Sequence, residues 1–353
     1  MRDVLGAIAS SFLIPEKTNA KIGFADTPEK ITFLQSGIVL YGIPLEITTS
    51  FGGGTRRGPE AIRVTSSRQI ETLVFDENVD ISTLKIFDLG DLILPNHAST
   101  RVDDYISESS HYINNNGNNS NNIMRDHGPT FSNETALSFL DQNVPKICRA
   151  IYYDAQKIPV IIGGEHTLSY YSIKALADER PLVIHFDAHR DMKKQYDNMR
   201  MCHTTPFYHI LKEGHIPGED IIQIGIRQGD YEENTTADKN GVTTFDAWSI
   251  HDDMKPLLLH LNKITQNRKI YITFDIDVYD LPYVPCTGTP EPFGLDPFQV
   301  ILILKSINKS ADLVGLDMVE VSAKLSDYRE GALATHTLYR LFTQLYKNKD
   351  DSM

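Results

Sequence analysis

The chain has 353 residues, of which 41% are hydrophobic and 23% charged, and its formal net charge is −13. This balance is typical of a globular protein with enough apolar residues for a sizeable core. The negative charge argues against a nucleic acid or an anionic membrane as partner, because both attract clustered Lys and Arg. A small cationic substrate is compatible with it.

The cysteines and the N-terminus bear on the cellular compartment. The 3 cysteines form no C-x-x-C pair, so neither a disulfide framework nor a cysteine zinc site is indicated, and a cytoplasmic location is expected. Asp3 interrupts the basic start of the chain, which favours a short N-terminal helix over a signal peptide. No apolar run approaches the ~18 residues that a membrane span needs.

Eight short apolar runs, each followed by Gly, Pro or Asp, predict strands. They cover residues 37–44, 84–91, 159–165, 181–188, 220–227, 242–248, 269–277 and 311–321. Helical patterns lie between most of them, at 134–157, 167–178, 253–266, 296–308 and 329–347. Several runs are apolar nearly throughout, as in strands buried on both faces of a parallel sheet. The alternation predicts an α/β fold in which right-handed crossovers place helices on both sides of the sheet.

One stretch does not fit this alternation. Residues 111–135 are rich in Asn and nearly free of aliphatic side chains, which predicts an inserted surface loop. We interpret His111 and His127 as solvated residues of that loop. The expected organisation is an N-terminal extension (1–34) followed by a single domain (35–348) that the loop interrupts.

Polar residues follow several of the predicted strands, at the edge where open α/β sheets place their sites. Asp187, His189 and Asp191 alternate, so an extended backbone would point all three to one side. Asp275 and Asp277 do the same after another strand. With His166 they form a set of six candidate metal ligands: His166, Asp187, His189, Asp191, Asp275 and Asp277.

Charge balance favours two metal ions for this set. Four crowded carboxylates repel one another and raise their pKa values unless cations neutralise them. Two divalent ions supply that charge and can share bridging carboxylates. Oxygen and imidazole ligands favour harder ions such as manganese, and nickel, cobalt and iron also suit these ligand types. We interpret His185 as a packed core histidine and Asp280 as a turn former.

At these residues the sequence resembles the ureohydrolases, the arginase and agmatinase family. The motifs are G-G-E-H at 163–166, D-A-H-R-D at 187–191 and FDIDVYDLPYVPCTGTPEP at 274–292. Residues 41–63 (YGIPLEITTSFGGGTRRGPEAIR) look like the opening strand and loop of agmatinase-type members. The resemblance spans about residues 35–345 and implies an arginase-like fold, a three-layer α/β/α domain with an eight-stranded parallel sheet.

The resemblance also implies how the candidate ligands are shared. His166, Asp187, Asp191 and Asp275 would bind one manganese. Asp187, His189, Asp275 and Asp277 would bind the other, so that Asp187 and Asp275 bridge.

The implied reaction is metal-assisted hydrolysis, in which hydroxide formed from a bridging water attacks a guanidinium carbon and releases urea and an amine. We also expect Asp191 to be a catalytic residue. His203 would give a proton to the leaving amine, and Glu320 would pair with the guanidinium in a planar bidentate match. Both would therefore contact the substrate. Family members are commonly trimers or hexamers, so a homo-oligomer is expected.

Agmatine, giving putrescine and urea, is the leading candidate substrate because its cationic tail suits an acidic chain. Arginases hold the α-carboxylate of arginine with Asn, Thr and Ser of this loop, whereas residues 192–198 here read Met-Lys-Lys-Gln-Tyr-Asp-Asn, which weakens arginine as the substrate. Positive charge at Arg190, Lys193 and Lys194 could pair with a carboxylate tail, so guanidinobutyrate and formimidoylglutamate remain alternative substrates. Free guanidine, which has no tail, is a further alternative. Two alternatives come from other classes of protein. A non-catalytic family member should have lost metal ligands, whereas all six candidates are present here. A binuclear metallophosphatase should have a basic phosphate-binding pocket.

Overall fold

The computed structural model describes residues 12–13, 16–17, 20–21, 23–25, 31–95, 133–323 and 327–346. The helix expected at the start of the N-terminus and most of the Asn-rich loop, with His111 and His127, lie outside the described residues.

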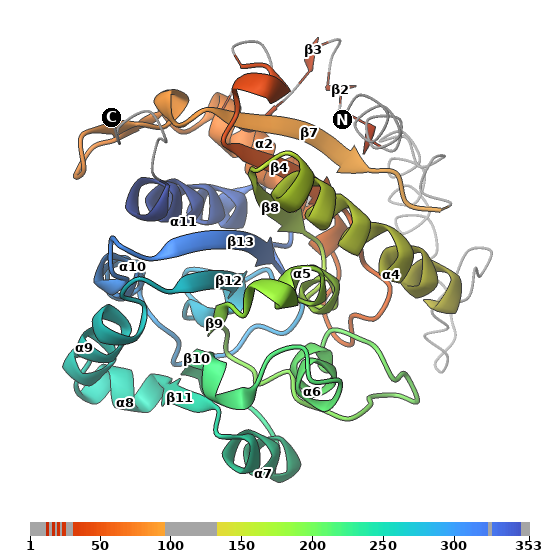
Figure 1. The fold of residues 1–353 in the computed structure, drawn as a ribbon, viewed down its shortest axis with the longest axis vertical. Helices are drawn as coiled ribbons and strands as arrows, with labels where there is room; N and C mark the ends of the chain where they lie inside the picture. Colours follow the sequence, from red (N-terminus) through yellow and green to blue (C-terminus); the bar gives the residue numbers. More distant parts are fainter. Residues whose placement is uncertain are drawn as a thin grey trace, which may run out of the picture.

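Eight parallel strands form the centre of the protein, and they match the eight predicted runs (Figure 1). Their order is β7 (Ile86–Leu92), β4 (Ile38–Ile43), β8 (Ile158–Gly163), β13 (Asp312–Val319), β12 (Lys269–Asp275), β9 (Leu182–Phe186), β10 (Ile221–Ile226) and β11 (Thr243–Asp246). The two-residue strand β1 (Phe12–Leu13) pairs antiparallel with β7 and adds an edge to the sheet. Two small pairs lie outside it, β2 (Glu16–Lys17) with β3 (Ala20–Lys21) and β5 (Leu73–Val74) with β6 (Val79–Asp80).

Helices cover both faces of the sheet, which confirms the predicted three-layer fold. One face packs against α2 (Gly58–Arg68), α8 (Ala247–Asp252), α9 (Lys255–Ile264), α10 (Pro297–Ser306) and α11 (Arg329–Leu345). The other packs against α4 (Asn133–Arg149), α5 (Leu168–Leu176), α6 (Pro206–Lys212) and α7 (Tyr231–Asn240).

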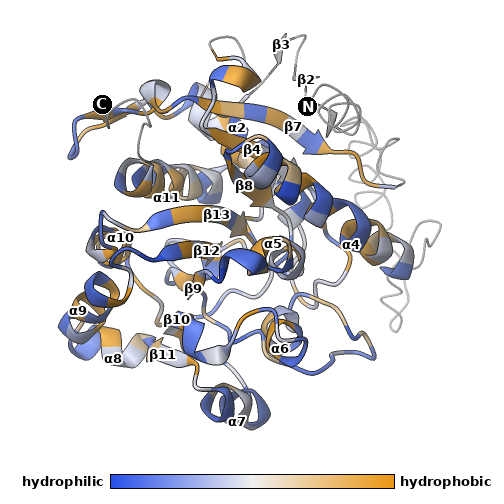
Figure 2. Ribbon diagram, in the orientation of Figure 1, coloured by the Kyte–Doolittle hydropathy of each residue, from blue (hydrophilic) through white to orange (hydrophobic). Residues whose placement is uncertain are grey.

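Two hydrophobic cores result, because successive side chains of a strand point to opposite faces. In β12, Ile270 and Ile272 belong to one core and Tyr271 to the other. Figure 2 shows the hydrophobic residues concentrated on the strands and the helices that flank them. The doubly covered sheet explains why several of its strands, such as β8 and β13, are apolar nearly throughout.

All five predicted helices are present, but α2, α6, α7 and α8 were not predicted. The strand predicted at 242–248 ends early, at Asp246, whose side chain accepts a hydrogen bond from the Ser249 amide and so caps α8. Asp230 and Glu233 form a capping box at the start of α7. Within the described residues, no helix combines the length and hydrophobicity needed to cross a membrane.

Candidate metal centre

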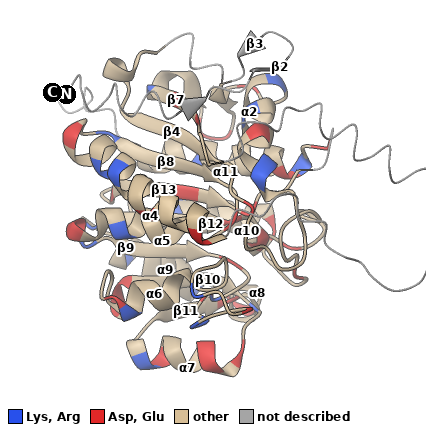
Figure 3. Cartoon of the chain, turned by 90° about the vertical axis from the view of Figure 1, so that its right-hand side faces the viewer, with Lys and Arg blue, Asp and Glu red and all other residues tan. Residues whose placement is uncertain are grey.

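The candidate ligands meet because their strands are neighbours in the sheet. β12 lies between β13 and β9, and β8 pairs with β13 on its other side. Asp187 follows the last residue of β9, Asp275 ends β12 and Glu320 follows β13. All these strands are parallel, so their carboxyl ends share one edge. Figure 3 shows charged residues mainly on the surrounding helices and loops, with Asp and Glu also in the interior near β12 and β13.

A first group of oxygens surrounds the Nδ1 atom of His166. Asp191 Oδ2 lies 3.0 Å from it, Asp187 Oδ2 3.1 Å and Asp275 Oδ2 3.2 Å. All four side chains are buried. Asp191 has a φ of +52°, a left-handed conformation that non-glycine residues rarely adopt and that concentrates at functional sites.

Hydrogen bonds behind His166 show which ring nitrogen is free. Its Nε2 lies 3.0 Å from Thr273 Oγ1. The Ser169 hydroxyl donates to the buried Asp317 carboxylate at 3.0 Å, so the Ser169 oxygen, 3.1 Å from Thr273 Oγ1, accepts from the Thr273 hydroxyl. The Thr273 oxygen therefore accepts from Nε2–H, which leaves a lone pair on Nδ1. That atom is buried and has no hydrogen-bond partner among the described residues. A metal cation would satisfy this lone pair and the three carboxylates around it.

A second group lies around the Nδ1 atom of His189. Asp277 Oδ2 is 3.0 Å from it and Asp187 Oδ1 is 3.5 Å away. Asp187 thus turns one oxygen toward each histidine, as a bridging carboxylate would. The Ala188 amide donates to Asp277 Oδ1 and the Asp277 amide to Asp275 Oδ1, both at 2.9 Å, so backbone groups hold these side chains in place.

The cluster carries more buried negative charge than its own side chains neutralise. Burial and the neighbouring Asp187 raise the pKa of Asp191 to about 7. Burial, Asp277 and Asp187 raise the pKa of Asp275 well above its usual range. Burial opposes a charge on His166, but its contacts with the carboxylates prevail and raise its pKa. A metal cation that binds such groups displaces their protons and neutralises the negative charge instead.

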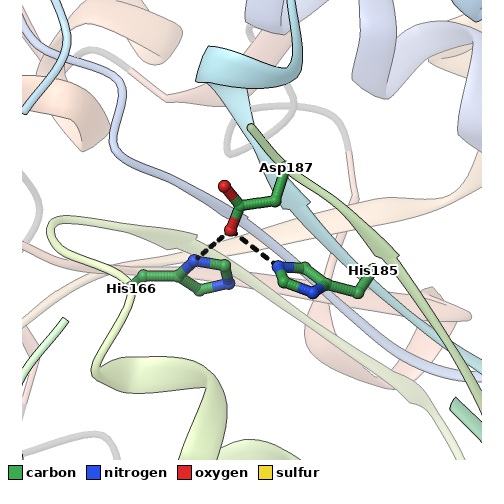
Figure 4. A group of neighbouring side chains, drawn as sticks. All are labelled: His166, His185 and Asp187. Atoms are coloured by element: carbon green, nitrogen blue, oxygen red, sulfur yellow. Dashed lines mark hydrogen bonds and ion pairs between the residues drawn. The ribbon is translucent and has the colours of Figure 1, made fainter. Parts of the chain in front are cut away.

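His185 lies in the core, as its sequence position suggested, and it also contacts a candidate ligand (Figure 4). Its ring stacks on Phe207 with centroids 4.1 Å apart. Gln223 Nε2 donates to His185 Nδ1 at 3.1 Å, so Nε2 carries the proton and donates to Asp187 Oδ2 at 2.7 Å. Burial lowers the pKa of His185 to about 4. It is therefore a neutral donor that orients Asp187, and it has no free lone pair for a metal.

The two further residues predicted to act on substrate are both buried near this cluster. Burial lowers the pKa of His203, so its ring is neutral near pH 7. Glu320 has a φ of +59°, and its Oε1 accepts from the His166 amide at 2.8 Å. Its Oε2 is buried without a hydrogen-bond partner among the described residues. A Cβ at position 288 would lie 2.6 Å from this oxygen, so any residue other than glycine there would displace the Glu320 carboxylate.

A cavity of about 290 Å³ adjoins the candidate ligands. Its walls are His189, Asp191, Lys193, Thr204, Gln228, Gly229, Asp230 and Glu233. Of the three basic residues expected near the substrate, only Lys193 lines this cavity. The Lys193 ammonium donates to Asp230 and Glu233. The Arg190 guanidinium instead donates to Gln223, Thr244 and Asn234. Asp280 begins a turn, as predicted, because its carbonyl accepts from the Tyr283 amide at 2.9 Å, and its side chain accepts from the Gly294 amide.

Comparison with known proteins identifies the family of this site. Residues 36–343 match the sequence profile of the arginase family. The chain belongs to the arginase family. It is 30% identical over 320 residues to an agmatinase of Bacillus subtilis, covering 89% of this chain and 92% of the relative. It is 29% identical to an agmatinase of Pyrococcus horikoshii over 80% of this chain and 83% of the relative.

Among solved structures, the agmatine ureohydrolase of Thermoplasma volcanium has the same fold, with a TM-score of 0.74 and 21% identity over 99% of this chain and 100% of that one. The arginase-family assignment, of agmatinase type, confirms the family predicted from the sequence motifs. The protein is therefore an enzyme of the ureohydrolase class.

Chelating the metal is expected to destabilise the protein more at about pH 8 than at about pH 5.5. Without a cation, the pKa of Asp191 is about 7, compared with ~3.9 in an unfolded chain. Between these values the folded state binds more protons, so its stability falls as pH rises. Bound cations would remove most of this dependence. Melting temperatures with manganese and with EDTA at both pH values test this, and an equal loss at each would contradict it.

Proposed function

We propose that this protein hydrolyses agmatine to putrescine and urea with two manganese ions held by the six candidate ligands. The observation that carries the guanidinium assignment is the buried Oε2 of Glu320, which has no hydrogen-bond partner in the described part of the chain and lies beside a cluster of candidate metal ligands. A buried carboxylate without a partner is unfavourable unless its ligand supplies one. A planar guanidinium offers N–H donors and the opposite charge.

The ligand types suit manganese because they are carboxylates and imidazoles without a thiolate. His166, Asp187, Asp191 and Asp275 would hold one ion and Asp187, His189, Asp275 and Asp277 the other. When bound, the two ions supply hydroxide near neutral pH by lowering the pKa of water.

The protein's own groups would orient the substrate and move one proton. Glu320 would accept guanidinium N–H bonds and hold the central carbon toward the ligand cluster. Attack by the hydroxide oxygen forms a new C–O bond, and the bond from carbon to the alkyl-bearing nitrogen breaks. The neutral His203 ring would take the proton of the attacking hydroxyl as the C–O bond forms and give it to the leaving nitrogen as the C–N bond breaks. The products are urea and a free amine.

The charge on the cavity wall favours a cationic tail. Asp230 and Glu233 carry two carboxylates there against one ammonium, that of Lys193. The wall therefore retains a net negative charge near the ligand cluster. Lys193 is the one observation that favours the second candidate, a substrate with a carboxylate tail such as guanidinobutyrate, because its ammonium could leave Asp230 for the substrate.

Urea release by the manganese-loaded protein tests both candidates. The substrates to compare are agmatine, guanidinobutyrate, arginine, formimidoylglutamate (assayed by formamide) and guanidine. We expect kcat/KM for agmatine to exceed the others by at least about tenfold, as for sites that pair a charged tail. A preference for guanidinobutyrate would support the second candidate. No turnover of any of the five would refute the proposal.

A further inference from the structure

The loop after β4 belongs to the motif at 41–63, and its role in the site depends on Glu165. This carboxylate is fully buried. Its Oε2 accepts from the amides of Ile47 at 2.6 Å and Thr48 at 2.8 Å. Its Oε1 accepts from the hydroxyls of Thr48 at 2.6 Å and Thr167 at 2.7 Å. Glu165 is thus satisfied by four donors and anchors a loop that precedes it by more than 100 residues.

These bonds fix the direction of the Thr48 hydroxyl. Its single hydrogen is donated to Glu165, so its oxygen only accepts. The His203 amide lies 3.0 Å from this oxygen and the His203 ring atom Nδ1 lies 3.3 Å from it. Two donors therefore come from His203, and one of them requires a hydrogen on Nδ1. Thr48 itself is buried, so water does not readily replace it as acceptor.

The other ring nitrogen of His203 has a different partner. A neutral imidazole carries one hydrogen, and with Nδ1 protonated the lone pair is on Nε2. Ser50 Oγ lies 3.3 Å from Nε2 and can donate to that lone pair. Ser50 and Thr48 thus hold the ring from two sides, and both come from the loop that Glu165 anchors.

We propose that Thr48 is a positioning residue that keeps His203 in the Nδ1–H tautomer and so makes Nε2 the atom that exchanges the proton. The inference rests on the proposed function, since it assigns the atom of His203 that serves the leaving amine. Glu165 acts one step further away, by orienting the Thr48 hydroxyl. Ser50 acts as a donor that the transferred proton displaces.

The Thr48→Val variant tests this, because valine keeps the shape of threonine and removes the acceptor. We expect kcat for agmatine to fall about 10- to 100-fold, within the ~10²–10⁴-fold contribution of general acid–base catalysis, with KM within about threefold. Thr48→Ser restores the hydroxyl and should keep kcat within about threefold of the natural protein. Thr49→Val, the same change at the next residue, is the matched control and should leave kcat within about twofold.

A spectroscopic measurement tests the tautomer without turnover. In ¹⁵N-labelled protein loaded with diamagnetic Zn²⁺, ring nitrogen shifts distinguish Nδ1–H from Nε2–H, and the signals lost in His203→Asn identify this residue. We expect Nδ1–H in the natural protein and a shift toward Nε2–H in Thr48→Val.

Nε2–H in the natural protein, or full kcat in Thr48→Val, would overturn the inference. If no substrate is turned over, the proposed function fails, whereas the nitrogen shifts still decide the tautomer. If Thr48→Val does not fold, the shifts of the natural protein and of Thr48→Ser decide it.

Discussion

Replacing Asp277 with asparagine is expected to reduce bound manganese from about two ions per chain to about one and to lower urea release at least about 100-fold. The Asp277 carboxylate lies 3.0 Å from His189 Nδ1, and the Ala188 amide fixes its other oxygen. Asparagine keeps the shape but removes the charge that the second ion needs. Elemental analysis of the purified protein and a urea assay measure the two effects.

Asp280→Asn is the matched control, three residues further along the chain. The Asp280 side chain accepts from the Gly294 amide, and an asparagine oxygen can do the same. We therefore expect unchanged metal content and turnover within about twofold. Full metal content and full turnover in Asp277→Asn would show that this residue is not a ligand.

The sheet was predictable because its inner strands, such as β12 and β13, are buried on both faces, which leaves long apolar runs in the sequence. Helix α7 was missed for the opposite reason. Its sequence is polar, and only Glu233 and Ala237 are buried, so it has no apolar period. The Asp230–Glu233 capping box was a usable signal at its start. The antiparallel edge strand β1 has only two residues, too few for a pattern.

The site was predictable where chemistry is written locally, as in D-A-H-R-D, and not where it depends on distant partners. Thr48 and Glu165 are 117 residues apart and meet because β4 and β8 are adjacent. The role of His185 depends on Gln223, 38 residues away, which fixes its tautomer. From the sequence alone, Thr48 resembles an ordinary loop residue and His185 an ordinary core residue, because their roles depend on these distant hydrogen-bond partners.

Replacing Glu320 with glutamine is expected to lower kcat/KM for agmatine at least about 30-fold while metal content stays near two ions. Removing one partner of a buried charge pair costs about 2–5 kcal/mol, and each ~1.4 kcal/mol is a factor of ten. The glutamine oxygen can still accept from the His166 amide, so the backbone of this candidate ligand keeps its hydrogen bond. A urea assay and elemental analysis separate substrate binding from metal binding.

The same substitution is expected to stabilise the metal-free protein, raising its melting temperature by about 2 °C at about pH 8. Burial raises the pKa of Glu320 well above its usual range. The folded state therefore holds this proton more tightly than the unfolded chain does, and its stability falls as pH rises above ~4.3. Glutamine has no charge to bury, so its advantage over the natural residue should be larger at pH 8 than at about pH 5.

Glu165→Gln is the decisive contrast, because both carboxylates are buried and differ in their partners. Four donors satisfy Glu165, and an amide nitrogen would face some of them, so this variant should lower the melting temperature. Among the residues that the structure describes, Glu320 has one donor, to Oε1, and its Oε2 has no hydrogen-bond partner. If Glu320→Gln raises the melting temperature and lowers turnover, the natural carboxylate destabilises the folded protein and is nevertheless needed to bind the substrate. Destabilisation by both variants would instead make Glu320 a structural residue.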